Sequence, residues 1–481
     1  MLSKSRIIDG LQCAKRLYLQ VHYPELSKVG PAAAHRFEVG HRVGEVARSL
    51  HPGGHLVAGN DLDAALIATE RELAQPGDKV VFEGTVAHGG VLIRADILER
   101  AGAGVVLREV KSSTRVKDYH YPDVAVQSWA LSGAGLPLSA SFLTHIDSSF
   151  VYAGDGNYSG LFRDVDVSTA IEPLVEKVPR WVEQFSRVVQ GPMPAVEPGD
   201  HCHDPFECPF HGHCTADGPA FPIEILPRGR KAVSALRAAG YRDLRDVPDG
   251  MLKSPKHIRV CNATKSGLPD VVQGAGGELA PLPYPRYYLD FETVQMAVPN
   301  WAGTGPYEQL PFQWSCHVEK ADGSLEHRAF LDLSGRPPMR AFALSLIDCI
   351  DLDGPVFAYT GFEQAIIKQC GARFPELADR LDGILERIVD LHPLTERSYY
   401  HPSMMGSWSI KAVVPTIAPD LDYAKLGEVR DGTQAGVAYV EAIDPRTAPD
   451  RRGEIENALR AYCANDTLAM VRLAHFLIER C

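Results

Sequence analysis

The sequence lacks any long apolar segment that is free of charges. Among its 481 residues no such run reaches the roughly 18 residues of a membrane span, which excludes a predicted membrane-spanning helix. The first twenty residues have no continuous apolar core and no small-residue cleavage site, so we expect no secretory signal. Internal repeats and low-complexity runs are also missing. We therefore expect a globular protein of the cytoplasm, without membrane partners, whose ten cysteines are thiols or metal ligands rather than disulfides.

An excess of positive charge is absent as well. The formal net charge is -12, which argues against a protein coated with nucleic acid. A local basic groove beside an acidic metal site stays open, because bound cations cancel the charge of their carboxylate ligands. The chain is 45% hydrophobic and 23% charged, as is usual for globular proteins. Its length predicts about two to four domains.

Two segments rich in proline and glycine, 190–222 and 265–286, divide the chain into predicted regions. We predict a first domain at 1–220, a helical connector at 221–285 and a last domain at 286–481. The connector loosely resembles a helix–hairpin–helix, which holds a phosphate backbone through backbone N–H groups; a plain helical linker is the alternative. Both larger regions alternate strands and helices, so the predicted fold class is α/β.

The apolar patterns predict particular strands and helices. In the first domain, strands at 91–99 and 105–113 form a hairpin, and a helix follows near 123–132. In the last domain we expect, in chain order, strands 287–292, 312–318 and 327–331, helix 339–350, strand 356–359, helix 363–373 and a long closing helix, 454–480.

Three cysteines are spaced regularly in the first breaker-rich segment. Cys202, Cys208 and Cys214 have five residues between neighbours, and their surroundings do not suit buried core thiols. Soft sulfur ligands favour zinc or an iron–sulfur cluster, with Cys13 as the candidate fourth ligand of a cluster. The alternative is Zn2+ bound by three cysteines and one of the neighbouring histidines, which are His201, His203, His211 and His213.

A first candidate carboxylate site lies on the predicted hairpin. Glu109 and Lys111 are two residues apart on one strand and project from the same face, and Asp96 lies on the preceding strand. Two carboxylates across a hairpin can hold Mg2+ or Mn2+. A lysine beside them can help to activate a water or stabilise charge on a phosphate. A surface ladder of alternating charges is the alternative.

Residues 1–220 resemble the RecB-like PD-(D/E)XK nucleases that carry an iron–sulfur cluster, as in AddB-type helicase–nucleases and the nucleases of CRISPR adaptation. The order of one early cysteine, the acidic motif and three late cysteines carries the resemblance. It implies that Asp96 and Glu109 bind the metal ion and that Lys111 is catalytic. It also implies a 4Fe–4S cluster that ties the N-terminal helix to the segment after the core, with four ligands: Cys13, Cys202, Cys208 and Cys214.

The same resemblance implies further residues of the first site. Gln127 matches the downstream glutamine that positions the substrate, although Leu131 replaces the usual tyrosine four residues later. In the upstream motif Gly44 stands where the family has histidine. His41 and Glu45 lie one helical turn apart, and we predict His41 as the substitute site residue.

A second candidate carboxylate site begins on the strand at 287–292. Asp290 and Glu292 share one face of this strand, and Leu289 lies on the opposite, core face. Two carboxylates side by side on a buried strand are costly unless a cation lies beside them. Far along the chain, Tyr462 and Asp466 are four residues apart on a predicted helix and share one face.

The last domain resembles the DnaQ-like exonucleases, which have an RNase H fold and the DEDD signature. Asp290 and Glu292 match the first motif, and Tyr462 and Asp466 match the third in its tyrosine variant. Glu363 stands at the aspartate of the second motif, with Asp390 as its rival. The resemblance implies a two-metal 3′→5′ exonuclease in which Tyr462 orients the water. The metal ligands would be Asp290, Glu292, Glu363 and Asp466.

The two resemblances together point to a bacterial family that fuses these modules. They imply a metal-dependent nuclease that binds nucleic acid, with single-stranded DNA or DNA ends favoured and RNA processing as an alternative. A second alternative is a nucleic-acid-binding scaffold in which one or both sites are inactive, as the departures at Gly44, Leu131 and Glu363 would allow.

Overall fold

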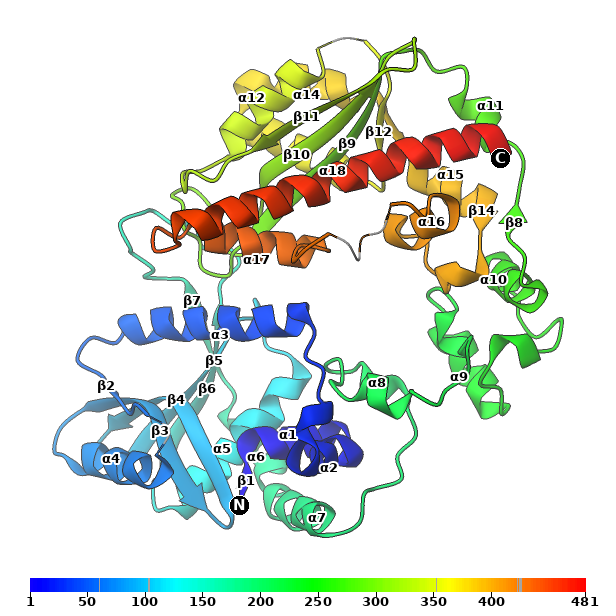
Figure 1. Ribbon diagram of the computed structural model, residues 1–481. Coiled ribbons are helices and arrows are strands. Elements are labelled where there is room, and N and C mark those ends of the chain that lie inside the picture. The colour runs from blue at the N-terminus through cyan, green and yellow to red at the C-terminus, as the bar shows by residue number, and fades with distance from the viewer. Residues whose placement is uncertain (60, 103, 352, 422, 424–425) are drawn as a thin grey trace. The chain divides into compact units, whose positions relative to one another are not determined.

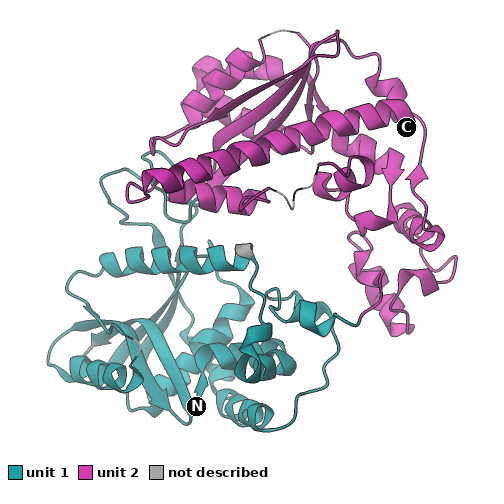
Figure 2. Ribbon diagram, viewed as in Figure 1, with its two compact units in different colours: residues 1–217, 296–308 teal, residues 218–295, 309–481 magenta. Residues whose placement is uncertain are grey.

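The computed structural model describes residues 1–481 except 60, 103, 352, 422 and 424–425, and divides the chain into two compact units (Figures 1 and 2). Unit 1 comprises 1–217 and 296–308, and unit 2 comprises 218–295 and 309–481. Each unit contains one large mixed sheet with helices, so the α/β class is confirmed. The predicted connector, 221–285, lies within unit 2.

Unit 1 is built on a seven-stranded sheet with the order β2-β3-β4-β5-β6-β7, in which β1 also pairs with β4. The predicted hairpin is confirmed, because β4 and β5 pair antiparallel, whereas β5 and β6 pair parallel. The strands are β1 (Leu2–Ser3), β2 (His55–Leu56), β3 (Lys79–His88), β4 (Val91–Ala101), β5 (Gly104–Lys111), β6 (Leu138–Ile146) and β7 (Phe162–Asp166).

Helix α5 is the central helix of unit 1. Its side chains Val124 and Leu131 are fully buried in one core with Leu107 of β5. Helices α1 and α7 join the same core, where Phe185 of α7 lies against Gly10 of α1. The helices of the unit are α1 (Lys4–Gln12), α2 (Ala14–His22), α3 (Pro31–Ser49), α4 (Leu62–Ala74), α5 (Tyr121–Gly133), α6 (Ser168–Val175), α7 (Val178–Gln190) and α8 (His211–Cys214).

The segment 296–308, which connects two strands of the other sheet, belongs to unit 1. Ala297 and Val298 pack with Val43 of α3 in a small apolar cluster. The hydroxyl of Tyr307 donates a hydrogen bond to the carbonyl of Ser112, at 2.5 Å. This segment therefore supports the end of β5 that carries the first candidate site.

Unit 2 is built on a five-stranded sheet with the order β11-β10-β9-β12-β13. The first three strands pair antiparallel, and β12 and β13 continue the sheet parallel to β9. The four predicted strands of this region are confirmed, with shifts of a few residues at their ends. They are β9 (Arg286–Gln295), β10 (Gln309–Glu319), β11 (Leu325–Leu331) and β12 (Val356–Ala358), and β13 (Ile388–Asp390) is a further strand that we did not predict.

Helices cover both faces of this sheet. Leu289 and Phe291 of β9 pack with Phe342 of α12 (Met339–Cys349) and with residues of α13 (Phe362–Arg373) and α14 (Ala378–Leu385). The opposite face, with Tyr288, lies against α18 (Pro449–Arg480), drawn in red across the sheet in Figure 1. Asp290 and Glu292 alternate with Leu289 and Phe291, so they face α18.

The remaining helices of unit 2 extend its core. The predicted connector contributes α9 (Arg230–Ala238), α10 (Pro255–Ser266) and α11 (Ala275–Leu279), and the segment after β13 contributes α15 (Leu391–Ser398), α16 (Ile410–Ile417) and α17 (Gly432–Ile443). Val260 of α10 and Leu279 of α11 share one core with Leu473 of α18. Among the described residues of either unit, no helix is both long and apolar enough to cross a membrane.

Gly406 packs against the backbone of Ile225 in the predicted connector, and a substitution there tests this contact. It has φ of 75°, and a Cβ atom there would lie 1.7 Å from the carbonyl oxygen of Ile225. We expect Gly406→Ala to lower the free energy of unfolding by about 2 kcal/mol or more, because both backbone strain and a backbone collision oppose the side chain. Thermal unfolding followed by circular dichroism measures the change.

The matched control is Gly383→Ala in α14, where a Cβ atom meets nothing within 4 Å. This change should leave stability equal or raise it by about 0.5–1 kcal/mol, because alanine favours helix over glycine. Equal stability of the two variants would contradict the packing of Gly406 against Ile225.

Candidate active sites

Strands β4 and β5 bring Asp96 beside Glu109 in unit 1. Asp96 Oδ2 accepts a hydrogen bond from the backbone N–H of Val110, at 2.7 Å. Glu83, opposite Asp96 in the register of β3 and β4, has φ of 55°, so the sheet is distorted next to the carboxylate. Burial and the charge of Glu109 raise the pKa of Asp96, and two nearby lysines oppose this shift.

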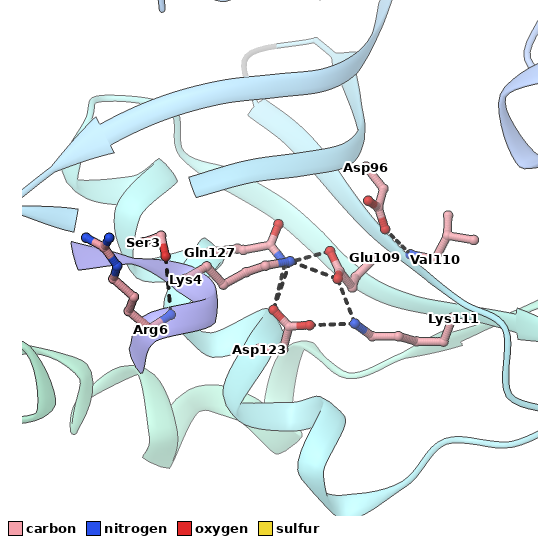
Figure 3. Close-up of polar contacts among 9 residues, drawn as sticks. All are labelled: Ser3, Lys4, Arg6, Asp96, Glu109, Val110, Lys111, Asp123 and Gln127. Carbon is pink, nitrogen blue, oxygen red and sulfur yellow. Dashed lines mark hydrogen bonds and ion pairs between the residues drawn. The ribbon is translucent and has the colours of Figure 1, made fainter. Parts of the chain in front are cut away.

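Glu109 is the centre of the first site (Figure 3). Its side chain is only 3% exposed, and its Oε1 atom accepts from Lys111 Nζ at 2.7 Å. Its Oε2 atom accepts from Gln127 Nε2 of α5 at 2.6 Å. Four of the predicted residues of this site are therefore gathered at one end of the β4–β5 pair.

Two residues that we did not predict for this site complete it. Lys4, the first residue of α1, places Nζ at 2.9 Å from Glu109 Oε1 and at 2.9 Å from Asp123 Oδ1. Asp123 of α5 also pairs with Lys111, at 2.5 Å. We call Lys4, Glu109, Lys111 and Asp123 the lysine–carboxylate cluster. One signal could have identified Asp123, because it lies four residues before Gln127 on one helix face.

Opposite charges determine the ionisation of this cluster. Burial alone would lower the pKa of Lys4 and of Lys111, but the carboxylates of Asp123 and Glu109 outweigh burial and hold both values above their usual range. Burial alone would raise the pKa of Asp123, but the two lysines hold it well below its usual range. Both lysines and Asp123 are therefore charged at neutral pH.

Leu131, which replaces the family's tyrosine, and His41, the predicted substitute for the family's histidine, have different surroundings. Leu131 is fully buried in the core of unit 1, so it cannot contact a substrate. His41 is exposed on α3, whose buried residues are Val43, Val46 and Ala47. Among the described residues, the hydrogen bonds and ion pairs of the lysine–carboxylate cluster do not include His41. The structure therefore does not bring this predicted residue into the first site.

The second site lies in unit 2 between β9 and α18. Oxygen atoms of Asp290 and Glu292 and the sulfur of Cys463 all lie within 4.8 Å of one another. Asp466 is one helical turn after Cys463 and is also buried. Glu363, in the first turn of α13, is 2% exposed. Three distant segments thus bring four carboxylates to one region.

Three of these carboxylates are buried and Asp290 is partly buried, with little positive charge to balance them. Burial, together with repulsion from its neighbours, raises the pKa of Asp290, Glu292 and Glu363 well above the usual values. Burial also raises the pKa of Asp466. Among the described residues, the buried Oε2 atom of Glu363 has no hydrogen-bond partner. A set of buried oxygen ligands with excess negative charge fits divalent cations.

The structure separates the two candidates for the fourth carboxylate. Asp390 caps α15, because its Oδ1 atom accepts from the backbone N–H groups of His392 and Thr360, both at 2.9 Å. Burial raises the pKa of Glu363, and the charges of Asp290, Asp390 and Asp466 raise it further, while its Oε2 atom has no hydrogen-bond partner among the described residues. The geometry therefore favours Glu363 as the carboxylate of the site and gives Asp390 a structural role.

Tyr462 lies beside a lysine that we did not predict for this site. Lys411 Nζ, from α16, donates to Tyr462 Oη at 2.7 Å and lies 4.6 Å from the centre of its ring. Burial and the charges of Asp466 and Glu292 raise the pKa of Tyr462, so its phenol stays protonated. Tyr423 donates to Asp466 Oδ1 at 2.6 Å. Isolated lysines and tyrosines carry no sequence signal for such roles.

Cys463 lies with Asp290 and Glu292 in the second site, but the chemistry of its thiol differs from that of the carboxylates. Burial, together with the charge of Asp290, raises the pKa of its thiol well above the usual value. The protonated sulfur donates to Asp290 Oδ2 at 3.4 Å. Because hard cations prefer oxygen ligands, we assign Cys463 to positioning Asp290 rather than to metal binding.

The four predicted cysteine ligands line one small pocket in unit 1. Cys13 lies between α1 and α2, Cys202 and Cys208 lie in the loop after α7, and Cys214 ends α8. The side chain of Gln12 holds this loop to α1 by donating to the carbonyls of His201 and Phe206, at 2.8 and 2.7 Å. These hydrogen bonds join α1 to a loop that lies 189 to 194 residues further along the chain.

One comparison with known proteins gives a partial match. Residues 287–409 match a family described as "Domain of unknown function (DUF2779)". The matched segment contains Asp290, Glu292 and Glu363, and ends before Tyr462 and Asp466. No curated protein matches the chain.

The raised pKa values of the second site predict how stability depends on pH and metal. Without metal, the folded state binds protons more tightly than the unfolded state, so the free energy of unfolding falls as pH rises above about 4.5. A bound divalent cation offsets the repulsion. We therefore expect Mg2+ to raise the unfolding temperature more at about pH 8 than at about pH 5.5.

Differential scanning fluorimetry with and without Mg2+ measures this effect, and Asp290→Asn should shrink the gain at the higher pH. Asp379→Asn, at an exposed position of α14, is the matched control and should keep the gain. A gain from Mg2+ that is equal at both pH values and survives Asp290→Asn would contradict a cation site at these carboxylates.

Proposed function

We propose that the protein is a metal-dependent nuclease with two sites, of which the second is a 3′→5′ exonuclease site. One observation carries the proposal: β9, α13 and α18 bring together three buried carboxylates, Glu292, Glu363 and Asp466, beside the partly buried Asp290, without matching positive charge. Carboxylate oxygens are the ligands that Mg2+ and Mn2+ prefer, and such paired sites serve phosphodiester hydrolysis.

The topology of unit 2 supports the RNase H-like interpretation. Three antiparallel strands are followed by two strands parallel to the central one, and Asp290 and Glu292 lie on that central strand. Tyr462 and Asp466 share one face of the closing helix, α18, as the tyrosine variant of the DEDD exonucleases requires. The polarity of cleavage, 3′→5′, comes from this resemblance.

The residues of the second site have distinct roles in this proposal. Asp290, Glu292, Glu363 and Asp466 would hold the divalent ions, which when bound supply an activated water and stabilise the leaving 3′ oxygen. Tyr462 stays protonated and donates a hydrogen bond that orients the water. Lys411 donates to Tyr462 Oη and so fixes the position of that oxygen.

We propose that the first site is a PD-(D/E)XK nuclease site that acts on single-stranded DNA or DNA ends. Asp96 and Glu109 would hold Mg2+ or Mn2+, since both carboxylates lie at one end of the β4–β5 pair. Lys111 bonds to Glu109, where an ammonium group can stabilise a charged phosphate. Gln127 fixes the other oxygen of Glu109.

The proposal includes a 4Fe–4S cluster in the cysteine pocket. All four cysteines line this one pocket, so they can supply the four thiolate ligands of a cluster. Lys15 and Arg16 line the pocket and offset the charge of thiolates.

The nuclease proposal predicts different effects of changes at the two sites. Purified protein with Mn2+ or Mg2+ should hydrolyse labelled single-stranded DNA, releasing 5′-nucleotides from the 3′ end. Asp290→Ala should reduce this release by about 100-fold or more, because a ligand to the catalytic ions is lost. Lys111→Ala should spare 3′-end release and abolish the remaining cleavage. Asp379→Ala, at an exposed position, should retain both.

Labelled RNA is tested alongside, because an RNA-processing enzyme would prefer it. Wild-type protein that binds single strands but hydrolyses neither DNA nor RNA would overturn the nuclease proposal and favour the scaffold.

The cluster proposal predicts a visible cofactor. Protein purified without oxygen should absorb light at about 400 nm and contain about four iron atoms per chain. Cys208→Ser should give insoluble or colourless protein, because the cluster ties α1 to the loop after α7. Cys481→Ser, at the end of the chain, should remain brown. Soluble, brown and active Cys208→Ser protein would contradict the proposal, and zinc in place of iron would support the alternative metal.

A further inference from the structure

Lys4 occupies an unusual place for a residue so close to the N-terminus (Figure 3). Its side chain is 18% exposed, and its ammonium group lies 2.9 Å from oxygens of both Glu109 and Asp123. Lys111 contacts the same two carboxylates. Two cations therefore converge on the carboxylate that the proposed function assigns to a metal ion.

The position of Lys4 is fixed from both ends of α1. Before it, Leu2 pairs with Val91 in the sheet. The hydroxyl of Ser3 caps the helix by accepting from the backbone N–H of Arg6, at 3.2 Å. At the other end, Gln12 bonds to the cysteine-bearing loop. Ile7 is fully buried between these points, so Lys4 is placed by a built element and not by a mobile tail.

Both oxygens of Glu109 already accept hydrogen bonds. Oε1 accepts from Lys4 and Lys111, and Oε2 accepts from Gln127. A divalent cation that binds Glu109 would lie close to an ammonium group and repel it. Both lysines have Asp123 as a second partner, so either could leave Glu109 without becoming an isolated buried charge. Lys111 is held two residues from Glu109 on the same strand, β5, whereas Lys4 comes from a separate helix, so Lys4 is the group that can move away from Glu109.

We propose that Lys4 competes with the divalent cation for Glu109 and, once displaced, stays beside Asp123 as a positive group for the substrate phosphate. This inference rests on the proposed function of the first site and adds two residues to it. Lys4 acts through Glu109 in the metal-free protein, where it is a positioning residue. Asp123 holds Lys4 in either state.

Removal of the positive charge of Lys4 should therefore strengthen metal binding at the first site and weaken substrate binding. We would measure Mn2+ affinity by electron paramagnetic resonance in protein that carries Asp290→Asn and Asp466→Asn, which remove two ligands of the second site. In this background Lys4→Met should bind Mn2+ about tenfold more tightly, because a nearby positive charge is lost. It should also raise KM for single-stranded DNA about tenfold.

Two variants serve as controls. Lys4→Arg keeps the positive charge and should bind Mn2+ within about threefold of the parent protein. Arg6→Met removes a positive charge from the same helix at a side chain whose guanidinium contacts the carbonyl of Met1, and should change neither quantity. A purely structural role of Lys4 would weaken metal binding and substrate binding together, so the opposite signs identify competition.

A measurement on the wild-type protein does not depend on how the variants fold. Acetic anhydride labelling followed by mass spectrometry reports the accessibility of each lysine, and Mg2+ should increase the labelling of Lys4 by about threefold or more while that of Lys15 stays constant. Unchanged labelling of Lys4 with Mg2+, or unchanged or weaker Mn2+ binding by Lys4→Met, would overturn the inference.

Failure of this inference and failure of the proposed function give different results. Asp290→Ala protein should keep the cleavage that does not start at the 3′ end. If Lys111→Ala protein keeps this cleavage as well, the first site is not a nuclease site. If Lys111→Ala loses that cleavage and Lys4→Met leaves Mn2+ affinity unchanged, only the role of Lys4 is wrong.

Discussion

Burying a carboxylate is costly unless a cation or hydrogen-bond donors lie beside it. Both units place carboxylates on or next to the strands of their sheets, and they meet this cost differently. In unit 1 the positive charge comes from the protein, since Lys4 and Lys111 both contact Glu109 and Asp123. In unit 2 burial, together with repulsion between neighbouring carboxylates, raises the pKa of Asp290, Glu292 and Glu363.

This difference has a consequence for the proposed function. Under that proposal, divalent ions bound at the second site would balance the charge of its carboxylates, and metal binding would be coupled to stability there. At the first site Lys4 and Lys111 already donate to Glu109, so under the proposal a metal ion would compete with these ammonium groups. In unit 1 a single helix, α1, carries Lys4 at one end and is followed by Cys13 at the other. The cysteine pocket and the lysine–carboxylate cluster therefore share one structural element.

Much of the fold could be predicted from local patterns in the sequence. Alternation along β9 predicted which side chains face the core, and the spacing of Tyr462 and Asp466 predicted a shared helix face. Leu289 and Phe291 pack on α12 to α14 as that alternation requires. The convergence of the predicted carboxylates and cysteines came from family resemblance, because local periodicity says nothing about which distant segments meet.

The residues that the sequence did not predict for the sites share one property. Lys4, Asp123 and Lys411 reach their sites from segments far from the motifs or outside any motif, and lysines and aspartates are most often surface residues. His41 shows the converse. Its position one turn from Glu45 was compatible with a site, but the apolar residues Val43, Val46 and Ala47 turn it outward on α3. Only packing decides such cases.

The central claim is that the buried carboxylates of unit 2 bind divalent cations. The most direct test is a crystal structure of the wild-type protein soaked in Mn2+, with the ions located by their anomalous scattering. The account predicts anomalous peaks coordinated by oxygens of Asp290, Glu292 and Asp466, with Glu363 at the same centre. Fully occupied Mn2+ elsewhere on the protein, with no peak at these four carboxylates, would contradict it.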